Sequence, residues 1–168
     1  FARKFTGKKG MVAMNGSYHG KSMGALSLTF NPKYRKSFQP LVEKVTFSPF
    51  GNIESLRDTI DDDTAFIILE PIQGESGIHV PPDGFLQGVR EICDENEILL
   101  IFDEIQSGLG RTGRMWASEH WETTPDIMCL AKGIAGGVPM GATLVRSDIL
   151  SVMKKGEHSS TFGGNPVS

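Results

Sequence analysis

The chain has 168 residues, of which 39% are apolar and 22% charged, a composition typical of one folded, soluble domain with a sizeable core. The formal net charge of −3 argues against a general nucleic-acid or anionic-membrane binder, because such proteins need a dense basic face. No apolar run approaches the roughly 18 to 20 residues that a membrane span needs, and the first residues lack the pattern of a signal peptide. We therefore expect a cytoplasmic protein.

The two cysteines, Cys93 and Cys129, form neither a CxxC motif nor a Cys/His cluster with the spacing of metal ligands. Both are expected to be small buried apolar residues. The sequence therefore predicts neither a disulfide scaffold nor a metal site.

Short apolar runs that alternate with helical or Gly/Pro-rich stretches are typical of parallel strands joined by crossover connections. Five runs predict strands, at residues 10–15, 65–71, 98–104, 126–132 and 142–147. The run at 65–71 has no period-two alternation, so both of its faces should be buried. The expected result is an α/β layer architecture with ligands at the carboxyl ends of the strands.

Helices are predicted between these strands. The first ten residues resemble the tail of a helix that runs into a turn, and residues 53–60 predict a short helix with Asn52 as its N-cap. A third helix of three turns is amphipathic, because its apolar residues recur at helical spacing and would cover the sheet. These residues are Phe85, Val89, Ile92 and Cys93.

Two residues at the ends of predicted strands indicate chemistry. Asp103 ends the run ILLIFDE, and Lys132 follows the run DIMCLA on a Gly-rich turn, so both can face one pocket. An amine and a carboxylate so placed suit pyridoxal 5′-phosphate: the amine forms a Schiff base with the aldehyde, and the carboxylate keeps the pyridine nitrogen protonated.

A nucleotide site is the first alternative, because GSYHGKS after a strand and LLIFDE after an aliphatic run resemble the two halves of a P-loop site. A phosphate-binding loop of this kind has four residues between its first glycine and its Gly-Lys pair. Here only three residues separate Gly16 from Gly20. The spacing therefore disfavours a nucleotide site, and a non-catalytic interaction module is a further alternative.

Five blocks in order resemble the class III aminotransferases, which are pyridoxal-phosphate enzymes of fold type I. The blocks are GSYHGKSMGALSLT, ILEPIQGESG, IFDEIQSGLGRTGRMWASEH, PDIMCLAKGIAGGVPMGA and HSSTFGGNP. The resemblance implies a three-layer α/β sandwich with a mostly parallel sheet, in which residues 1–168 form part of the large coenzyme-binding domain, truncated at both ends. The phosphate-binding turn would then lie upstream and the small domain downstream.

The same resemblance implies roles in binding the coenzyme. Lys132 is expected to form the Schiff base and to move the proton, and Asp103 to contact the pyridine nitrogen. Gln106 is expected to reach the phenolic oxygen, and Tyr18 to stack on the ring. His19 is expected to lie beside the ring, without a role in proton transfer.

Further positions are matched by resemblance alone. Thr161 corresponds to a threonine that crosses a homodimer interface to the coenzyme phosphate of the other subunit. Glu75 corresponds to a glutamate that pairs with a substrate-side arginine in ornithine- and acetylornithine-type relatives. Lys21 stands where many relatives have an arginine for an α-carboxylate, which favours an ω-amine donor. Glu70 and Glu104 are expected to be structural.

The implied reaction moves an amino group from an ω-amine donor to an oxo acid, 2-oxoglutarate. The donor can be of the putrescine, ornithine, acetylornithine or 4-aminobutyrate type. The same scaffold also hosts an aminomutase and a decarboxylase, so the sequence indicates the coenzyme more firmly than the reaction. The expected partners are these small molecules and a second copy of the chain.

Overall fold

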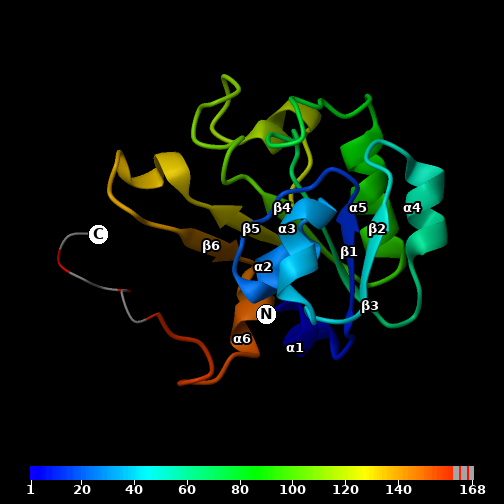
Figure 1. Ribbon diagram of the computed structural model, residues 1–168, viewed down its shortest axis with the longest axis horizontal. Helices are drawn as coiled ribbons and strands as arrows, with labels where there is room; N and C mark the ends of the chain where they lie inside the picture. The colour runs from blue at the N-terminus through cyan, green and yellow to red at the C-terminus, as the bar shows by residue number, and fades with distance from the viewer. Residues whose placement is uncertain (161–162, 164–165, 167–168) are drawn as a thin grey trace.

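A single six-stranded sheet organises the molecule (Figure 1). The computed structural model describes residues 1–160, 163 and 166. The strand order is β2-β1-β3-β4-β5-β6. The strands are β1 (Gly10–Met14), β2 (Val45–Ser48), β3 (Thr64–Leu69), β4 (Leu99–Asp103), β5 (Ile127–Leu130) and β6 (Ala142–Val145).

Short helices connect the strands. The α-helices are α1 (Ala2–Thr6), α2 (Met23–Leu28), α3 (Pro32–Arg35), α4 (Ile53–Thr59), α5 (Phe85–Glu95) and α6 (Ser147–Ser151). Three 3₁₀ helices are also present: η1 (Lys36–Phe38), η2 (Ala117–Trp121) and η3 (Lys132–Ala135). Within the described part of the chain, no helix has both the length and the apolar character that crossing a membrane requires.

Apolar side chains cover both faces of the sheet, which gives three layers. Along β3 every residue is buried: Ile67 and Leu69 belong to one core cluster, and Phe66 and Ile68 to the other. The first cluster packs under α4 and α5, and the second under α1, α2 and α6. This arrangement confirms the predicted α/β sandwich and explains why the run 65–71 lacks alternation.

The two predicted helices between strands are observed at their predicted positions. In α4 the side chain of Asn52 accepts a hydrogen bond from the Ser55 N–H at 2.9 Å, so Asn52 is the N-cap. In α5 the apolar residues on the predicted face are all buried against the sheet: Phe85, Val89, Ile92 and Cys93. The spacing of apolar residues was therefore a reliable guide to these helices.

The sheet departs from the expectation in two ways. Strand β2 was not predicted: it has four residues at the sheet edge, and only Ser48 among them is buried, so the sequence lacks an apolar run there. Strand β6 was predicted among parallel strands, but it is antiparallel to β5. The chain between β5 and β6 contains only η3 and a glycine-rich turn, without the helix that a parallel crossover needs.

Candidate active site

The carboxyl ends of β4 and β5 bring Asp103 and Lys132 together. These strands are parallel neighbours, and Asp103 lies opposite Cys129 in their register. The segments that follow the two strands therefore leave the sheet on the same side. Asp103 and Lys132 line one cavity of about 120 Å³, together with Tyr18, His19 and Gln106. A cavity at this edge of a parallel sheet is a common ligand site in α/β proteins.

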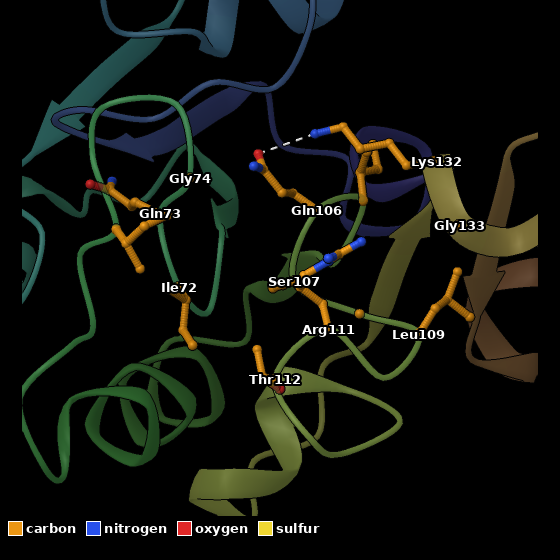
Figure 2. Close-up of a pocket in the computed structure, with 13 residues that line it drawn as sticks. Ile72, Gln73, Gly74, Gln106, Ser107, Leu109, Arg111, Thr112, Lys132 and Gly133 are labelled. Atoms are coloured by element: carbon orange, nitrogen blue, oxygen red, sulfur yellow. Dashed lines mark hydrogen bonds between the residues drawn. The ribbon is translucent and has the colours of Figure 1, made fainter.

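Lys132 begins η3 directly after β5. Its backbone φ is 45°, in the left-handed region that residues other than glycine rarely adopt. The side chain is exposed, and its Nζ donates a hydrogen bond to Gln106 Oε1 at 3.1 Å (Figure 2). The strained backbone at a cavity wall is typical of residues that act on a ligand.

Asp103 is buried, with 5% of its surface exposed, and has two hydrogen-bond partners. Its Oδ1 accepts from the Ile105 N–H at 3.0 Å, and its Oδ2 lies 2.8 Å from His19 Nδ1. His19 is itself held by its backbone N–H, which donates to Thr29 Oγ1 at 3.0 Å. The other ring nitrogen, His19 Nε2, is buried and has no hydrogen-bond partner among the described residues.

Glu70 joins the two loops above the cavity. Its Oε2 accepts from the Tyr18 N–H at 3.1 Å, and its Oε1 accepts from the Gly74 N–H at 3.3 Å. Burial raises the pKa of the Glu70 carboxyl, while nearby His19 and these backbone hydrogen bonds act in the opposite direction. Glu70 therefore has the expected structural role of anchoring a loop.

Glu104 fixes the segment that carries Gln106. It is fully buried and accepts hydrogen bonds from Ser107 Oγ at 2.6 Å, the Ala117 N–H at 3.1 Å and the Ser118 N–H at 2.9 Å. These contacts tie the two ends of the loop that follows β4. Glu104 is thus structural, as expected from its position next to Asp103.

A larger cavity of about 470 Å³ adjoins the smaller one and shares Ile105, Gln106 and Lys132 with it (Figure 2). Its other walls come from the loop after β3 and from the loop after β4. A volume of this order is typical of a site for a small molecule. The remaining lining residues are Ile72, Gln73, Gly74, Ile78, Ser107, Gly108, Leu109, Arg111, Thr112 and Gly133.

Two other predicted site residues, Glu75 and Lys21, lie elsewhere. Glu75 is exposed and lines a separate cavity of about 390 Å³ with Tyr18 and Tyr34. Lys21 is exposed, and its Nζ lies 5.2 Å from the centre of the Tyr34 ring. The structure thus places neither Glu75 nor Lys21 on the walls of the two cavities that Lys132 lines. Thr161 lies outside the described residues.

Sequence reasoning passed over two residues of the larger cavity, Gly74 and Arg111. Both stand inside blocks that were identified, ILEPIQGESG and IFDEIQSGLGRTGRMWASEH, but neither was singled out. A glycine directly before an acidic residue and an arginine in a Gly-rich loop carry no local signal of a site. Only their position beside Gln106 and Lys132 indicates one.

Comparison with known proteins places the chain in the same family that the sequence motifs resemble. The chain matches the family described as "Aminotransferase class-III" over residues 1–168. It is 52% identical over 167 residues to an acetylornithine aminotransferase of Methanopyrus kandleri, and 50% identical over 159 residues to ornithine aminotransferase 1 of Staphylococcus saprophyticus. These alignments cover 99% and 94% of this chain but only 43% and 40% of the relatives. The chain therefore spans less than half the length of the relatives that it matches.

Solved structures agree with the sequence comparison. The crystal structure of the ornithine aminotransferase from Toxoplasma gondii superposes with a TM-score of 0.94 at 36% identity, over 99% of this chain and 42% of that one. A second crystal structure of that enzyme is described as having partial occupancy of pyridoxal phosphate at its active site. The same fold thus holds the coenzyme in a related protein.

Proposed function

Since the chain belongs to the class III aminotransferases, we propose that its protein transfers an amino group from an ornithine-type ω-amine donor to 2-oxoglutarate. One observation carries the proposal: Lys132 and the buried carboxylate of Asp103 line a single cavity at the ends of β4 and β5. Amino transfer with pyridoxal 5′-phosphate requires a lysine amine and a carboxylate that contact the same coenzyme molecule.

Class III aminotransferases depend on pyridoxal 5′-phosphate, and the residues of the smaller cavity fit this coenzyme. Asp103 is a buried acceptor for a protonated ring nitrogen, and Tyr18 and Ile105 provide apolar surface for a flat ring. His19, which also lines this cavity, has a buried Nε2 that lacks a hydrogen-bond partner among the described residues. When bound, the coenzyme supplies an aldehyde and an electron-accepting ring.

Lys132 is proposed to hold the coenzyme aldehyde covalently through its Nζ. In the coenzyme-loaded protein this Nζ would also be the group that takes the proton from the substrate carbon that carries the amine. The hydrogen bond to Gln106 Oε1 at 3.1 Å orients the Nζ toward the cavity. Gln106 is a neutral acceptor, so it directs the amine without adding a charge to the site.

Asp103 is proposed to accept the hydrogen bond of the ring nitrogen. Its contacts with His19 Nδ1 and the Ile105 N–H fix the carboxylate in one orientation. Tyr18 is proposed to cover the ring, since its backbone is held by Glu70 and its side chain packs edge-on against Tyr34 at 5.6 Å between ring centres. These contacts preorganise the cavity before the ligand arrives.

The donor class rests on the names of the relatives. Acetylornithine and ornithine aminotransferases are the relatives at 45% to 52% identity, and both names describe amines with an ornithine skeleton. We propose Glu75 and Lys21 as residues near the far end of the donor, although Glu75 lines a separate cavity and Lys21 lies over the Tyr34 ring. Substitution of Glu75 or Lys21 should therefore change which donor is preferred, and should leave binding of the coenzyme unchanged.

The test uses the full-length protein loaded with pyridoxal 5′-phosphate. Reduction with borohydride should fix the coenzyme on the peptide that contains Lys132, as read by mass spectrometry. Lys132→Ala should abolish the visible absorbance and lower amino transfer by at least about 10²- to 10⁴-fold, since the proton carrier is lost. The control is Lys33→Ala, an exposed lysine on α3. A coenzyme fixed on another lysine would reject the assignment.

We also propose a homodimer in which Thr161 reaches the coenzyme phosphate of the neighbouring subunit. The proposal rests on the family resemblance of the HSSTFGGNP block. Mixing inactive Lys132→Ala subunits with inactive Thr161→Ala subunits should restore one working site per mixed dimer. Activity that stays at zero after subunit exchange, verified by mass spectrometry of the mixed dimer, would contradict a shared site.

A further inference from the structure

Two residues with left-handed backbones line the larger cavity. Lys132 has a φ of 45°, and Leu109, in the loop after β4, has a φ of 58°. A leucine in this region is unusual, because its Cβ crowds the backbone, and glycine is the residue that normally occupies it. Such conformations persist where surrounding contacts hold them, and they gather at functional sites. The leucine therefore needs an explanation in terms of what its side chain contacts.

The Leu109 side chain packs against the start of η3. A Cβ built on Gly133 would lie 3.7 Å from Leu109 Cδ1 and 3.8 Å from Leu109 Cβ, which is ordinary van der Waals contact. The half-buried Leu109 side chain thus lies beside the backbone that directly follows Lys132, and Figure 2 shows the three residues along one wall of the cavity. The contact joins the loop after β4 to the turn after β5.

The turn that carries Lys132 receives little support from the core. None of the residues of η3, Lys132–Ala135, is buried. The Ile134 N–H donates to the Ala131 carbonyl at 3.2 Å, and the Gly136 N–H to the Gly133 carbonyl at 3.4 Å. These two hydrogen bonds fix the shape of the turn, but they do not attach it to another element. Leu109 provides an apolar attachment of this kind.

The backbone on either side of Leu109 is itself fixed. The Gly108 N–H donates to the Glu104 carbonyl at 3.0 Å, and a Cβ built on Gly108 would lie 2.8 Å from that oxygen. The Gly110 N–H donates to the Met115 carbonyl at 3.3 Å. These contacts hold the loop without using the Leu109 side chain. The side chain is therefore presented to η3 from a well-supported backbone.

We propose that Leu109 is a positioning residue for Lys132: its side chain holds the Gly133 backbone, and so sets the direction from which the Lys132 Nζ enters the cavity. This inference rests on the proposed function and deepens it. A glycine at position 109 would relieve the backbone but would leave nothing to pack against Gly133. A reacting group that is displaced by about 1 Å can lose on the order of 100-fold in rate.

The test compares Leu109→Ala, Leu109→Gly and Leu109→Met in the full-length, coenzyme-loaded protein. The first two remove the contact, so each should lower kcat by about 10- to 100-fold and leave KM little changed. Both should also shift the pH at which the visible absorbance of the coenzyme changes, because the Lys132 nitrogen is displaced. Leu109→Met keeps an apolar side chain of similar volume and should recover most of the wild-type kcat.

Stability separates positioning from a purely structural role. Leu109→Gly relieves the left-handed backbone and Leu109→Ala does not, so Leu109→Gly should unfold at the higher urea concentration. A structural role predicts that kcat follows this order, whereas positioning predicts similar losses in both variants. Hydrogen exchange at the Ile134 amide, measured with and without the coenzyme, should be faster in both, because η3 has lost its contact.

Met115→Ala is the matched control, because Met115 is an apolar residue of the same loop that is 56% exposed and does not line the cavity. It should change neither kcat, nor the absorbance titration, nor the exchange at Ile134. A loss of kcat in Met115→Ala equal to that in Leu109→Ala would show that the loop responds to any truncation, and would overturn the specific role of Leu109.

Failure of this inference is distinct from failure of the proposed function. A wild-type protein in which borohydride fixes no coenzyme on Lys132 would reject the proposed function itself. With a working wild type, Leu109→Ala and Leu109→Gly variants that keep the wild-type kcat would overturn the role of Leu109. So would a loss of kcat that follows the urea stability of the variants, or one that leaves the absorbance titration and the Ile134 exchange unchanged.

Discussion

Gly74 and Gln106 lie so close together that a methyl group built on Gly74 would be 2.3 Å from Gln106 Oε1. The same Oε1 accepts the hydrogen bond of Lys132. The absence of a side chain at Gly74 therefore leaves the space in which Gln106 meets the Lys132 amine. Gly74 is in turn fixed by its N–H, which donates to Glu70.

Gly74→Ala should displace the Gln106 amide from Lys132, since a Cβ that close to Gln106 forces the side chain to move. We expect a loss of about 10-fold or more in amino transfer, the worth of one misplaced hydrogen bond at the reacting group. The pH dependence of the coenzyme absorbance should change as well. The measurement is a half-reaction with the full-length protein, together with a spectroscopic titration.

The control for this substitution is Gly24→Ala on α2, where no heavy atom lies within 4 Å of the added methyl group. It should leave activity unchanged. In a Gln106→Ala background the space at Gly74 is empty, so Gly74→Ala should have no further effect there. Equal losses in both backgrounds would show that Gly74 acts through something other than Gln106.

His19→Ala should destabilise the protein, because it removes the 2.8 Å hydrogen bond to the buried carboxylate of Asp103. Losing a hydrogen bond to a charged group costs about 1.5–3 kcal/mol in the free energy of unfolding. Urea unfolding of the full-length protein measures this value. His79→Ala is the comparison, since the His79 side chain is exposed and its ring nitrogen is hydrogen-bonded to the nearby Ser76 carbonyl at 3.1 Å. A similar small loss for both variants would contradict a special role for the His19 contact.

The sequence was sufficient to predict the strands that form continuous apolar runs and the helices whose apolar residues recur at helical spacing. The strands β1, β3, β4, β5 and β6 and the helices α4 and α5 were all predicted within about two residues of their observed ends. Strand β2 was missed because a largely unburied strand of four residues at the edge of a sheet forms no such run. The short helices α2 and α3 were missed for the same reason, since each has six residues or fewer.

That Asp103 and Lys132 line one cavity could be predicted, because they lie at the carboxyl ends of neighbouring buried strands. The contact of Gly74 with Gln106 could not, because it joins two loops whose paths depend on Glu70 and Glu104. The family resemblance named Glu75 and Lys21 but gave no position for either relative to Lys132. Side-chain contacts between loops are a property of the folded chain.

Cys93 and Cys129 should resist alkylation at neutral pH. Burial raises the pKa of the Cys93 thiol to about 12 and that of Cys129 to about 11, with the charge of Asp103 adding to the second shift. Only the thiolate reacts, so at pH 8 the rates should be about 1,000-fold and about 100-fold below those of the unfolded chain. Iodoacetamide labelling, followed by mass spectrometry, should modify Cys129 before Cys93.

The same shifts predict the sign of a pH effect on stability. The folded thiols keep their protons at a pH where the unfolded thiols, with a pKa of 9.0, lose theirs. The folded state should therefore lose stability as the pH rises above about 9, and the thiols contribute no change below that value. Cys93→Ala should reduce this loss in urea unfolding curves at pH 8 and pH 10. If wild type and Cys93→Ala lost the same unfolding free energy between pH 8 and pH 10, the raised pKa of Cys93 would be contradicted.

Asp126→Ala should destabilise the start of β5. Asp126 is buried at 5% exposure, accepts from the Leu100 N–H of β4 at 2.8 Å, and pairs with Arg90 at 2.9 Å and with Arg146. Removing one member of a buried ion pair typically costs about 3–5 kcal/mol in the free energy of unfolding. Asp148→Ala, which breaks only an exposed contact with Arg146, is the control and should cost far less. Hydrogen exchange at the Leu100 amide reports the effect locally, because this N–H donates to Asp126. Protection of this amide should be lost in Asp126→Ala and kept in Asp148→Ala. Protection that is kept in both variants would refute the role of Asp126.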